Sequence, residues 1–253
     1  MKIIKSFIVA FSTYSRIPMP QFSWKDEDMQ YSLCFFPLVG AVIGALVAGF
    51  LFLAVRLDLG WLCTCLISTA IPLLVTGGFH LDGFMDVSDA FHSYGDRERK
   101  LEILKDAHIG AFAVIRTVVC ILIFISAFSE ITGIKAMAVF CVGFVLSRTL
   151  SGLSLVYLKP AKGDGLLFTF ANAANRNIVR VVLWIEFVLA AGFMLYLDAV
   201  SGGLSVAAAV ICFLYYDYKS KKELGGITGD MAGYFVVICE TAIAIACAVG
   251  SRI

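Results

Sequence analysis

The run GAFAVIRTVVCILIFISAFS at residues 110–129 decides the fold class, because it carries a single charged side chain, Arg116. An apolar run of about 20 residues is long enough to cross the hydrocarbon core of a bilayer as a helix. The rest of the chain agrees with this run, since 60% of its 253 residues are hydrophobic and 15% are charged. That composition is far from that of soluble domains, and it predicts an integral membrane protein built from helices.

Further apolar segments extend this pattern in both directions along the chain. They are placed at 33–55, 61–79, 136–158, 179–197, 202–216 and 230–249. No connection between them is long enough to form a separate soluble domain. We therefore predict an all-α polytopic membrane protein with about seven transmembrane helices, forming a single integral-membrane domain over residues 1–253.

Residues 1–17 have a different pattern, with apolar side chains on one helical stripe and polar ones elsewhere. The stripe contains Ile3, Ile4, Phe7, Ile8, Phe11 and Tyr14. This is typical of an amphipathic helix that lies in the membrane interface. Pro18 and Pro20 are expected to end it.

Positive charges are distributed unequally between the connections. Fifteen of the 20 Lys and Arg residues lie in 1–32, 80–109, 159–180 and 217–229, whereas the opposite ends of the predicted spans carry three. The positive-inside rule then places the N-terminus and all long connections in the cytoplasm. No basic patch is interleaved with aromatic residues, so a nucleic-acid partner is excluded. The bilayer is the expected partner, and assembly into a homo-oligomer is left open.

Three carboxylates stand out in the connection before residue 110. Asp82, Asp86 and Asp89 are spaced at i, i+4 and i+7, so in a helix they share one face. Like charges at this spacing repel one another, which favours a bound cation, and carboxylate oxygens suit Mg²⁺. A solvated acidic helix end is the alternative interpretation.

Other polar side chains of the same connection are candidates for the same site. His80 is a candidate base or a partner of the carboxylates, and Asp106 is a further candidate metal ligand or substrate contact. Lys105 and Arg97 are candidate phosphate contacts. Simple packing for His80 and a solvated helix face around Arg97 are the alternatives.

A glycine-rich turn at 225–229 precedes the last apolar segment. Its backbone N–H groups, at the start of a helix, are suited to an anion. Thr228 or Asp230 could cap that helix instead of contacting a ligand. The predicted topology places Asp230 on the same membrane face as Asp82.

Four charged residues lie within the predicted spans, where charges are expensive. Counted along the helices from the cytoplasmic ends of the spans, Arg148 and Glu240 lie at similar depths in the membrane, and so do Arg116 and Glu186. These similar depths predict two ion pairs, Arg148 with Glu240 and Arg116 with Glu186. Alternatively, Arg148 points into a cavity and binds a phosphate.

Several of these motifs resemble the cobalamin synthase family, the adenosylcobinamide-GDP ribazoletransferases. The resemblance rests on GGFHLDGFMDVSD at 77–89, DRERKLEILKDAHIGAFAV at 96–114, RIPMP at 16–20, FPLVG at 36–40, Ser147-Arg148 and GITGDMAG at 226–233. It covers nearly the whole chain. The family pattern has an Arg where Lys162 stands, which is one departure.

The resemblance implies a Mg²⁺-dependent enzyme of the bacterial cytoplasmic (inner) membrane whose active site faces the cytoplasm. Its substrates would be adenosylcobinamide-GDP and α-ribazole or α-ribazole 5′-phosphate, and its products adenosylcobalamin, or its 5′-phosphate, and GMP. It also implies that Asp82, Asp86, Asp89 and Asp106 hold the metal, and that Asp230 is a ligand or the base. Asp82, Asp230 and His80 are then the catalytic candidates, with Lys105, Arg148, Arg97 and Thr228 at the substrate.

Other functions fit parts of the same pattern. A membrane prenyltransferase would require a second Asp-rich motif, and a CDP-alcohol phosphotransferase-like enzyme would use a similar Asp cluster and divalent metal. A divalent-cation transporter would bury its acidic ligands near the membrane midplane, where the chain offers only Glu186 and Glu240.

Overall fold

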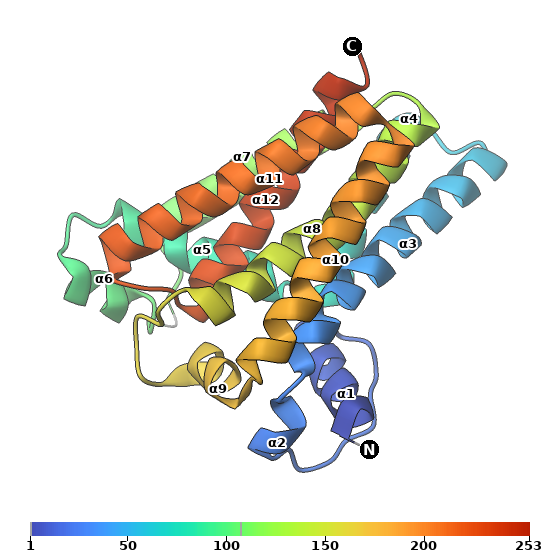
Figure 1. Cartoon of the computed structure of the whole chain (residues 1–253). Helices are drawn as coiled ribbons and strands as arrows, with labels where there is room; N and C mark the ends of the chain where they lie inside the picture. Colours follow the sequence, from blue (N-terminus) through green and yellow to red (C-terminus); the bar gives the residue numbers. More distant parts are fainter. Residues whose placement is uncertain (1, 107) are drawn as a thin grey trace.

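The computed structural model describes residues 2–106 and 108–253, which form helices and turns with no strand. The long helices are α3 (Phe36–Arg56), α4 (Trp61–Thr76), α7 (Ala111–Ser129), α8 (Ile134–Tyr157), α10 (Arg176–Leu197), α11 (Ala199–Lys219) and α12 (Gly229–Gly250). The shorter ones are α1 (Lys2–Tyr14), α2 (Asp26–Met29), α5 (Phe79–His92), α6 (Arg97–Ile103) and α9 (Gly165–Ala173) (Figure 1). The predicted all-α polytopic fold is confirmed.

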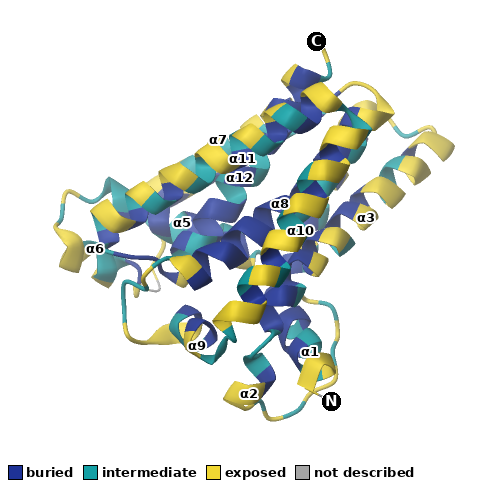
Figure 2. Ribbon diagram, viewed as in Figure 1, coloured by how far each residue is buried: buried dark blue, intermediate teal, exposed yellow. Residues whose placement is uncertain are grey.

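Helix α8 forms the centre of the bundle. It packs against α3, α10, α11 and α12, and most of its side chains are buried. The outward faces of α3 and α10 are exposed (Figure 2). The exposed side chains of α3, α7 and α10 include many large apolar ones, as expected for helices that contact lipid. Six helical segments of the described residues are long and apolar enough to cross a membrane.

The predicted span at 61–79 corresponds to α4, which is shorter than predicted and forms a bent pair with the helix that follows it. Helix α4 ends at Thr76, and the next helix, α5, is bent from it by 92°. Gly77 and Gly78 form the bend with φ values of 62° and 79°, which glycine adopts without a steric penalty. The predicted polar connection at 80–109 is therefore mostly helical, because it contains α5 and α6. Helix α4 is the apolar half of the bent pair, and α5, which carries the carboxylates, is its polar half and lies outside the membrane-spanning helices.

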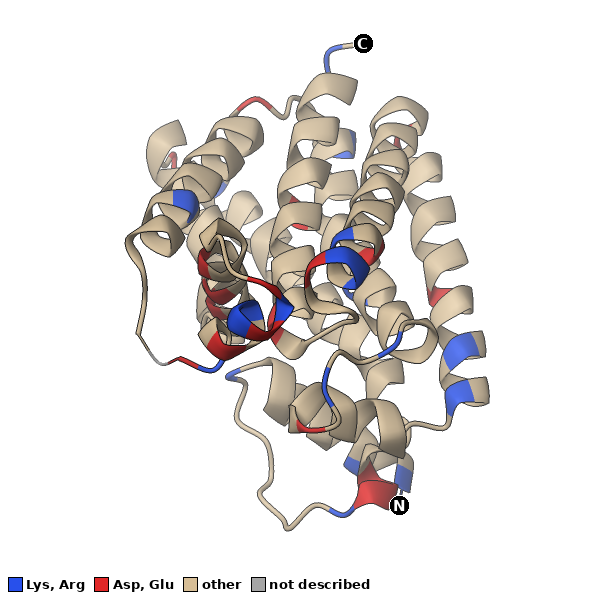
Figure 3. Cartoon of the chain, turned by 90° about the vertical axis from the view of Figure 1, so that its left-hand side faces the viewer, with Lys and Arg blue, Asp and Glu red and all other residues tan. Residues whose placement is uncertain are grey.

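The N-terminal amphipathic helix is present as α1, and it is anchored to the protein as well as amphipathic. Phe11 and Tyr14 are buried, whereas Ile3 and Ile4 are exposed. The Ser6 hydroxyl donates to the backbone carbonyl of Asp28, 2.6 Å away, and ties α1 to α2. Charged residues gather in the half of the molecule that holds the N-terminus, away from the C-terminus (Figure 3).

One of the two predicted intramembrane ion pairs is confirmed. The Arg148 guanidinium on α8 pairs with the Glu240 carboxylate on α12 and also donates to the carbonyl of Phe144, 3.0 Å away. The Arg148 side chain is 1% exposed and that of Glu240 11%. The pairing of Arg116 with Glu186 is wrong, because no ion pair within the described residues joins them. They lie on α7 and α10, and equal depth did not bring them together.

Helices α5 and α12 cross in close contact through two glycines. A Cβ atom at Gly83 would lie 2.7 Å from the backbone oxygen of Asp230, and one at Gly233 would lie 2.9 Å from that of His80. Both distances are shorter than side chains allow. The two glycines therefore bring the acidic face of α5 to the first turn of α12.

We expect Gly83→Ala to separate α5 from α12, because its methyl group would meet backbone atoms that cannot rotate away. Overpacking of this kind costs about 1–3 kcal/mol, so the melting temperature in detergent should fall. Gly49→Ala is the matched control, since no atom lies within 4 Å of a Cβ there. Equal melting temperatures for the two variants would contradict the close crossing.

The buried pair predicts a second result. Glu240→Leu leaves the Arg148 charge buried without a partner, which should cost about 3–5 kcal/mol. The double variant Arg148→Met/Glu240→Leu removes both charges and should be more stable than the single variant. Thermal unfolding in detergent measures both, and a double variant no more stable than Glu240→Leu would argue against an energetic coupling.

Candidate functional site

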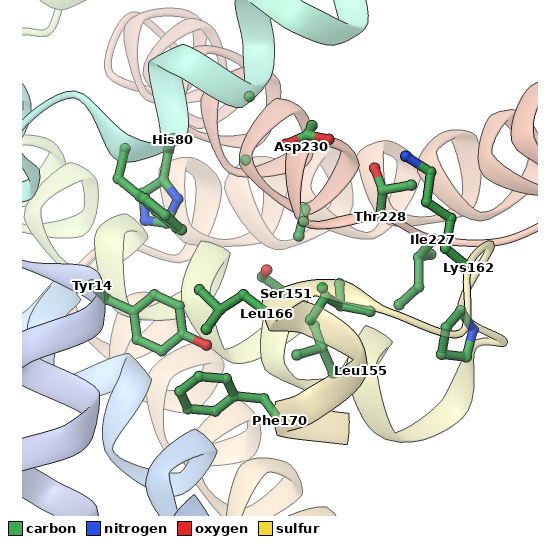
Figure 4. A pocket seen from close by; sticks show the side chains of 18 of the residues that line it. Tyr14, His80, Ser151, Leu155, Lys162, Leu166, Phe170, Ile227, Thr228 and Asp230 are labelled. Atoms are coloured by element: carbon green, nitrogen blue, oxygen red, sulfur yellow. The ribbon is translucent and has the colours of Figure 1, made fainter. Parts of the chain in front are cut away.

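The predicted site residues meet at a cavity of about 410 Å³ at the end of the bundle that holds the N-terminus. Its walls come from α1, α5, α8, α9, the first turn of α12 and the segment 160–167 (Figure 4). Five of the predicted residues line it: His80, Asp82, Lys105, Thr228 and Asp230. They come from segments far apart in sequence, and the α5–α12 crossing is what brings the two acidic ones together.

The three spaced carboxylates lie on one helix, as predicted. Asp82 is exposed and lines the cavity, whereas Asp86 and Asp89 are half-buried one and two turns further along α5. Burial, and then the charges of Asp82, Asp230 and Asp89, raise the pKa of Asp86 to about 6. Each of these negative charges disfavours ionisation of Asp86. The ionised carboxylates therefore repel one another, and a bound cation would reduce that repulsion.

Asp89 also has a structural role. Its Oδ2 accepts a hydrogen bond from the Gly110 amide, 2.5 Å away, and its Oδ1 accepts one from the Ala113 amide, 3.0 Å away. The side chain therefore caps the N-terminus of α7 from a different helix, which is favourable for a carboxylate. Metal binding by Asp89 stays a prediction.

The start of α12 is held in place by its own cap and by the preceding turn. The Thr228 hydroxyl accepts from the Met231 amide, 3.1 Å away, which confirms the predicted capping role. Ile227 exchanges backbone hydrogen bonds with Lys159 and Ala161. These bonds fix the 159–164 segment beside the N-terminus of α12, where backbone N–H groups and the helix dipole favour an anion.

Two lysines bring positive charge to the cavity. Lys105 was predicted, and Lys162 was noted only as a departure from the family pattern, so sequence reasoning missed it. Burial, and next the charge of Lys105, lower the pKa of Lys162. An anion between the two ammonium groups would relieve their repulsion. The signal that could have identified Lys162 was its position in a long connection on the same side as Asp82.

The inner half of the cavity is apolar and aromatic. Tyr14, Leu155, Leu166 and Phe170 form much of it (Figure 4). His80 lies at this end, is 6% exposed, and has no hydrogen-bond partner on either ring nitrogen within the described residues. A buried polar ring without a partner is costly, which fits a side chain that contacts a ligand.

The structure places the remaining predicted residues away from the cavity. The Arg97 guanidinium donates to the carbonyl of Ala161, 3.4 Å away, and so connects α6 to the 159–164 segment. Neither residue lines the cavity. Asp106 is exposed and contacts His108, with 2.6 Å between Oδ1 and Nδ1. Arg148 does not line the cavity, because its guanidinium is buried against Glu240. The structure thus favours the ion-pair interpretation of Arg148 over the phosphate contact.

The candidate metal ligands of the site suit Mg²⁺ in part. Carboxylate oxygens are its preferred protein ligands, and the repulsion at Asp86 indicates a place for a cation. Among residues 2–106 and 108–253, however, no three His, Cys, Asp or Glu side chains converge on one point. This arrangement fits an ion held by one or two carboxylates together with substrate phosphates, which is common for Mg²⁺.

Comparison with known proteins identifies the family of this chain. Residues 6–248 match the family described as cobalamin-5-phosphate synthase. A protein of Lachnoclostridium phytofermentans named adenosylcobinamide-GDP ribazoletransferase is 42% identical, over 95% of this chain and 92% of its own length. Proteins with the same name from Clostridium perfringens SM101 and Geobacillus sp. WCH70 are 32% and 34% identical, over 95% and 93% of this chain and 96% and 92% of their own lengths.

No solved structure matches the chain. The family match begins within α1 and ends within α12, and it includes every residue that lines the cavity. It agrees with the resemblance seen in the sequence motifs. The chain belongs to the cobalamin-5-phosphate synthase family.

Proposed function

We propose that this protein transfers the adenosylcobinamide phosphate moiety from adenosylcobinamide-GDP to α-ribazole or α-ribazole 5′-phosphate, releasing GMP. The observation that carries the proposal is the meeting of Asp82, Asp230, Lys105 and Lys162 at one cavity. Acidic and basic groups in one place are what a phosphoryl transfer between two polar substrates requires. The names of the relatives support the same reaction.

The reaction is a displacement at phosphorus. A ribose hydroxyl oxygen of the acceptor forms a bond to the phosphorus next to the cobinamide, and the bond from that phosphorus to the oxygen of the GMP phosphate breaks. The hydroxyl proton goes to a base on the protein, and the electron pair of the broken bond leaves with GMP. No oxidant or reductant is needed.

Each cavity residue has a part that follows from its position. Lys105 and Lys162 bind the oxygens of the donor's two phosphates, and the N–H groups at the start of α12 add partial positive charge. Asp230, at that helix end, is our candidate for the base. His80 at the apolar end is the second candidate, because its ring nitrogens have no other partner.

Asp82 and Asp86 would hold Mg²⁺ together with substrate phosphates. The bound ion would neutralise charge that develops on the phosphoryl oxygens and on the leaving group. The raised pKa of Asp86 supports this assignment, since burial and then the charges of Asp82, Asp230 and Asp89 disfavour its ionised form, which a bound cation would stabilise. Asp89 and Asp106 stay as further predicted ligands.

We further propose that the cavity opens to the cytoplasm of a bacterial cell, at the inner membrane. The excess of Lys and Arg on this side of the bundle supports that orientation. GMP and ribazole are polar, so a cavity at the membrane boundary lets them exchange with water.

The first test uses purified protein in proteoliposomes with adenosylcobinamide-GDP, α-ribazole and Mg²⁺. GMP and cobalamin should appear together in equal amounts. Asp82→Asn, which removes one charge and no volume, should lower kcat/KM by about a thousandfold or more. Near-normal activity in a correctly inserted Asp82→Asn protein would reject the assigned site, and wild-type protein that makes no GMP would reject the reaction.

A second test uses Asp86→Asn in thermal unfolding. Because the pKa of folded Asp86 is about 6, above its ordinary value, the stability that its protonated form contributes is complete below about pH 4 and is lost as the pH rises through 6. With chelator at pH 8, Asp86→Asn should therefore be more stable than wild type, by about 1 kcal/mol or less after allowance for solvent screening.

This difference should shrink as the pH falls towards 4. At pH 8, added Mg²⁺ should raise the melting temperature of wild type more than that of Asp86→Asn. Asp26→Asn, at an exposed position on α2, is the control and should respond to Mg²⁺ like wild type. An equal Mg²⁺ response in all three proteins would contradict an ion at Asp86.

A further inference from the structure

A second cavity of about 480 Å³ lies beside the first, and nothing in the proposed mechanism uses it. It is a groove between the chain that follows α1 and the bend from α4 to α5. Its polar lining includes Ser12, Thr13, Arg16, Gln21 and Asp82. Asp82 lines both cavities, so the two spaces meet at the residue on which the proposed chemistry depends.

Arg16 is positioned by the bend. Its amide donates to the carbonyl of Val75 at the end of α4, 2.7 Å away. Its side chain passes over Gly77, where a Cβ atom would overlap the guanidinium Nε. The α4–α5 bend therefore has a glycine where the arginine crosses it, and the arginine is directed into the groove.

Three of the polar side chains in the lining, those of Arg16, Ser12 and Thr13, make no side-chain hydrogen bond within the described residues, whereas Gln21 donates to the carbonyl of Met19, 3.4 Å away. The Arg16 guanidinium takes part in none of the ion pairs or side-chain hydrogen bonds of residues 2–106 and 108–253. In the same part of the chain, the hydroxyls of Ser12 and Thr13 are buried without a partner. The exposed arginine fork, whose N–H donors are unused in the described part of the chain, is suited to a phosphate group.

We propose that this groove binds a phosphate monoester carried by the acceptor substrate, with Arg16 as its principal ligand. The inference rests on the proposed function, since it assigns a second subsite to the same reaction. It makes Arg16 a specificity-determining residue: the 5′-phosphate of the acceptor binds in the groove, and the acceptor hydroxyl reaches the phosphorus from the groove side of Asp82.

The distribution of charge favours the acceptor over the donor. The first cavity offers two lysines, a helix N-terminus and an apolar half, which suit a pyrophosphate joined to a large organic group. The groove offers a single arginine, which matches one phosphate group. In phosphoryl transfer the attacking and leaving oxygens lie roughly in line on opposite sides of phosphorus, and two cavities that meet at Asp82 allow this approach.

The test is a comparison of KM values in proteoliposomes for three substrates: α-ribazole 5′-phosphate, α-ribazole and adenosylcobinamide-GDP. Arg16→Gln should raise KM for the phosphorylated acceptor by about ten- to a hundredfold, the usual loss for a hydrogen bond to a charged group. KM for free α-ribazole and for the donor should change less than about threefold. Arg16→Lys, which keeps the charge without the fork, should be intermediate.

Arg176→Gln is the matched control, because Arg176 is exposed on α10 and lines neither cavity. Retained turnover of free α-ribazole shows that Arg16→Gln is folded. The inference would be overturned if KM changed equally for the two acceptors, or if it changed for neither. It would also be overturned if KM rose for the donor alone, because that result would assign the groove to the donor's phosphates. If wild-type protein released no GMP with either acceptor, the proposed function itself would fail.

Discussion

The close crossing of α5 and α12 is the contact on which the site depends. Gly83 and Gly233 let the two backbones approach to distances that no side chain permits. As a consequence, the carboxylates of α5 lie beside the first turn of α12, where Thr228 caps the helix and Asp230 lines the same cavity. Burial, and then the charges of the neighbouring carboxylates, raise the pKa of Asp86. Helix packing therefore holds negative charges closer together than their mutual repulsion favours.

That packing is supported by an ion pair buried within the helix bundle. The Arg148–Glu240 pair joins α8 to α12 in a region where an unpaired charge would be costly. Asp89 caps α7 from α5, and Ile227 binds the 159–164 segment. Each of these contacts uses a polar group to fix one wall of the cavity, so several charged residues near the site hold structure and leave the catalytic work to fewer side chains.

The bend between α4 and α5 has two effects. It turns α5 by 92° from α4, which places the polar helix at the end of the bundle. It also creates the groove in which Arg16 lies, on the other side of Asp82 from the main cavity. One pair of glycines with positive φ thus shapes both spaces, and this explains why a carboxylate just after the bend is shared between them.

The membrane class, the approximate spans and the acidic face of α5 could all be predicted from the amino-acid sequence, because hydrophobic runs and helical periodicity are local properties. Five of the residues that line the cavity could also be selected from the sequence, because polar residues near the ends of apolar spans stand out there. They are His80, Asp82, Lys105, Thr228 and Asp230. Only the tertiary structure placed Lys162 at the cavity, moved Arg97 and Arg148 away from it, and separated Arg116 from Glu186. Those outcomes depend on which helices are neighbours and on the angle at which they cross, and helix packing over long sequence separations fixes both.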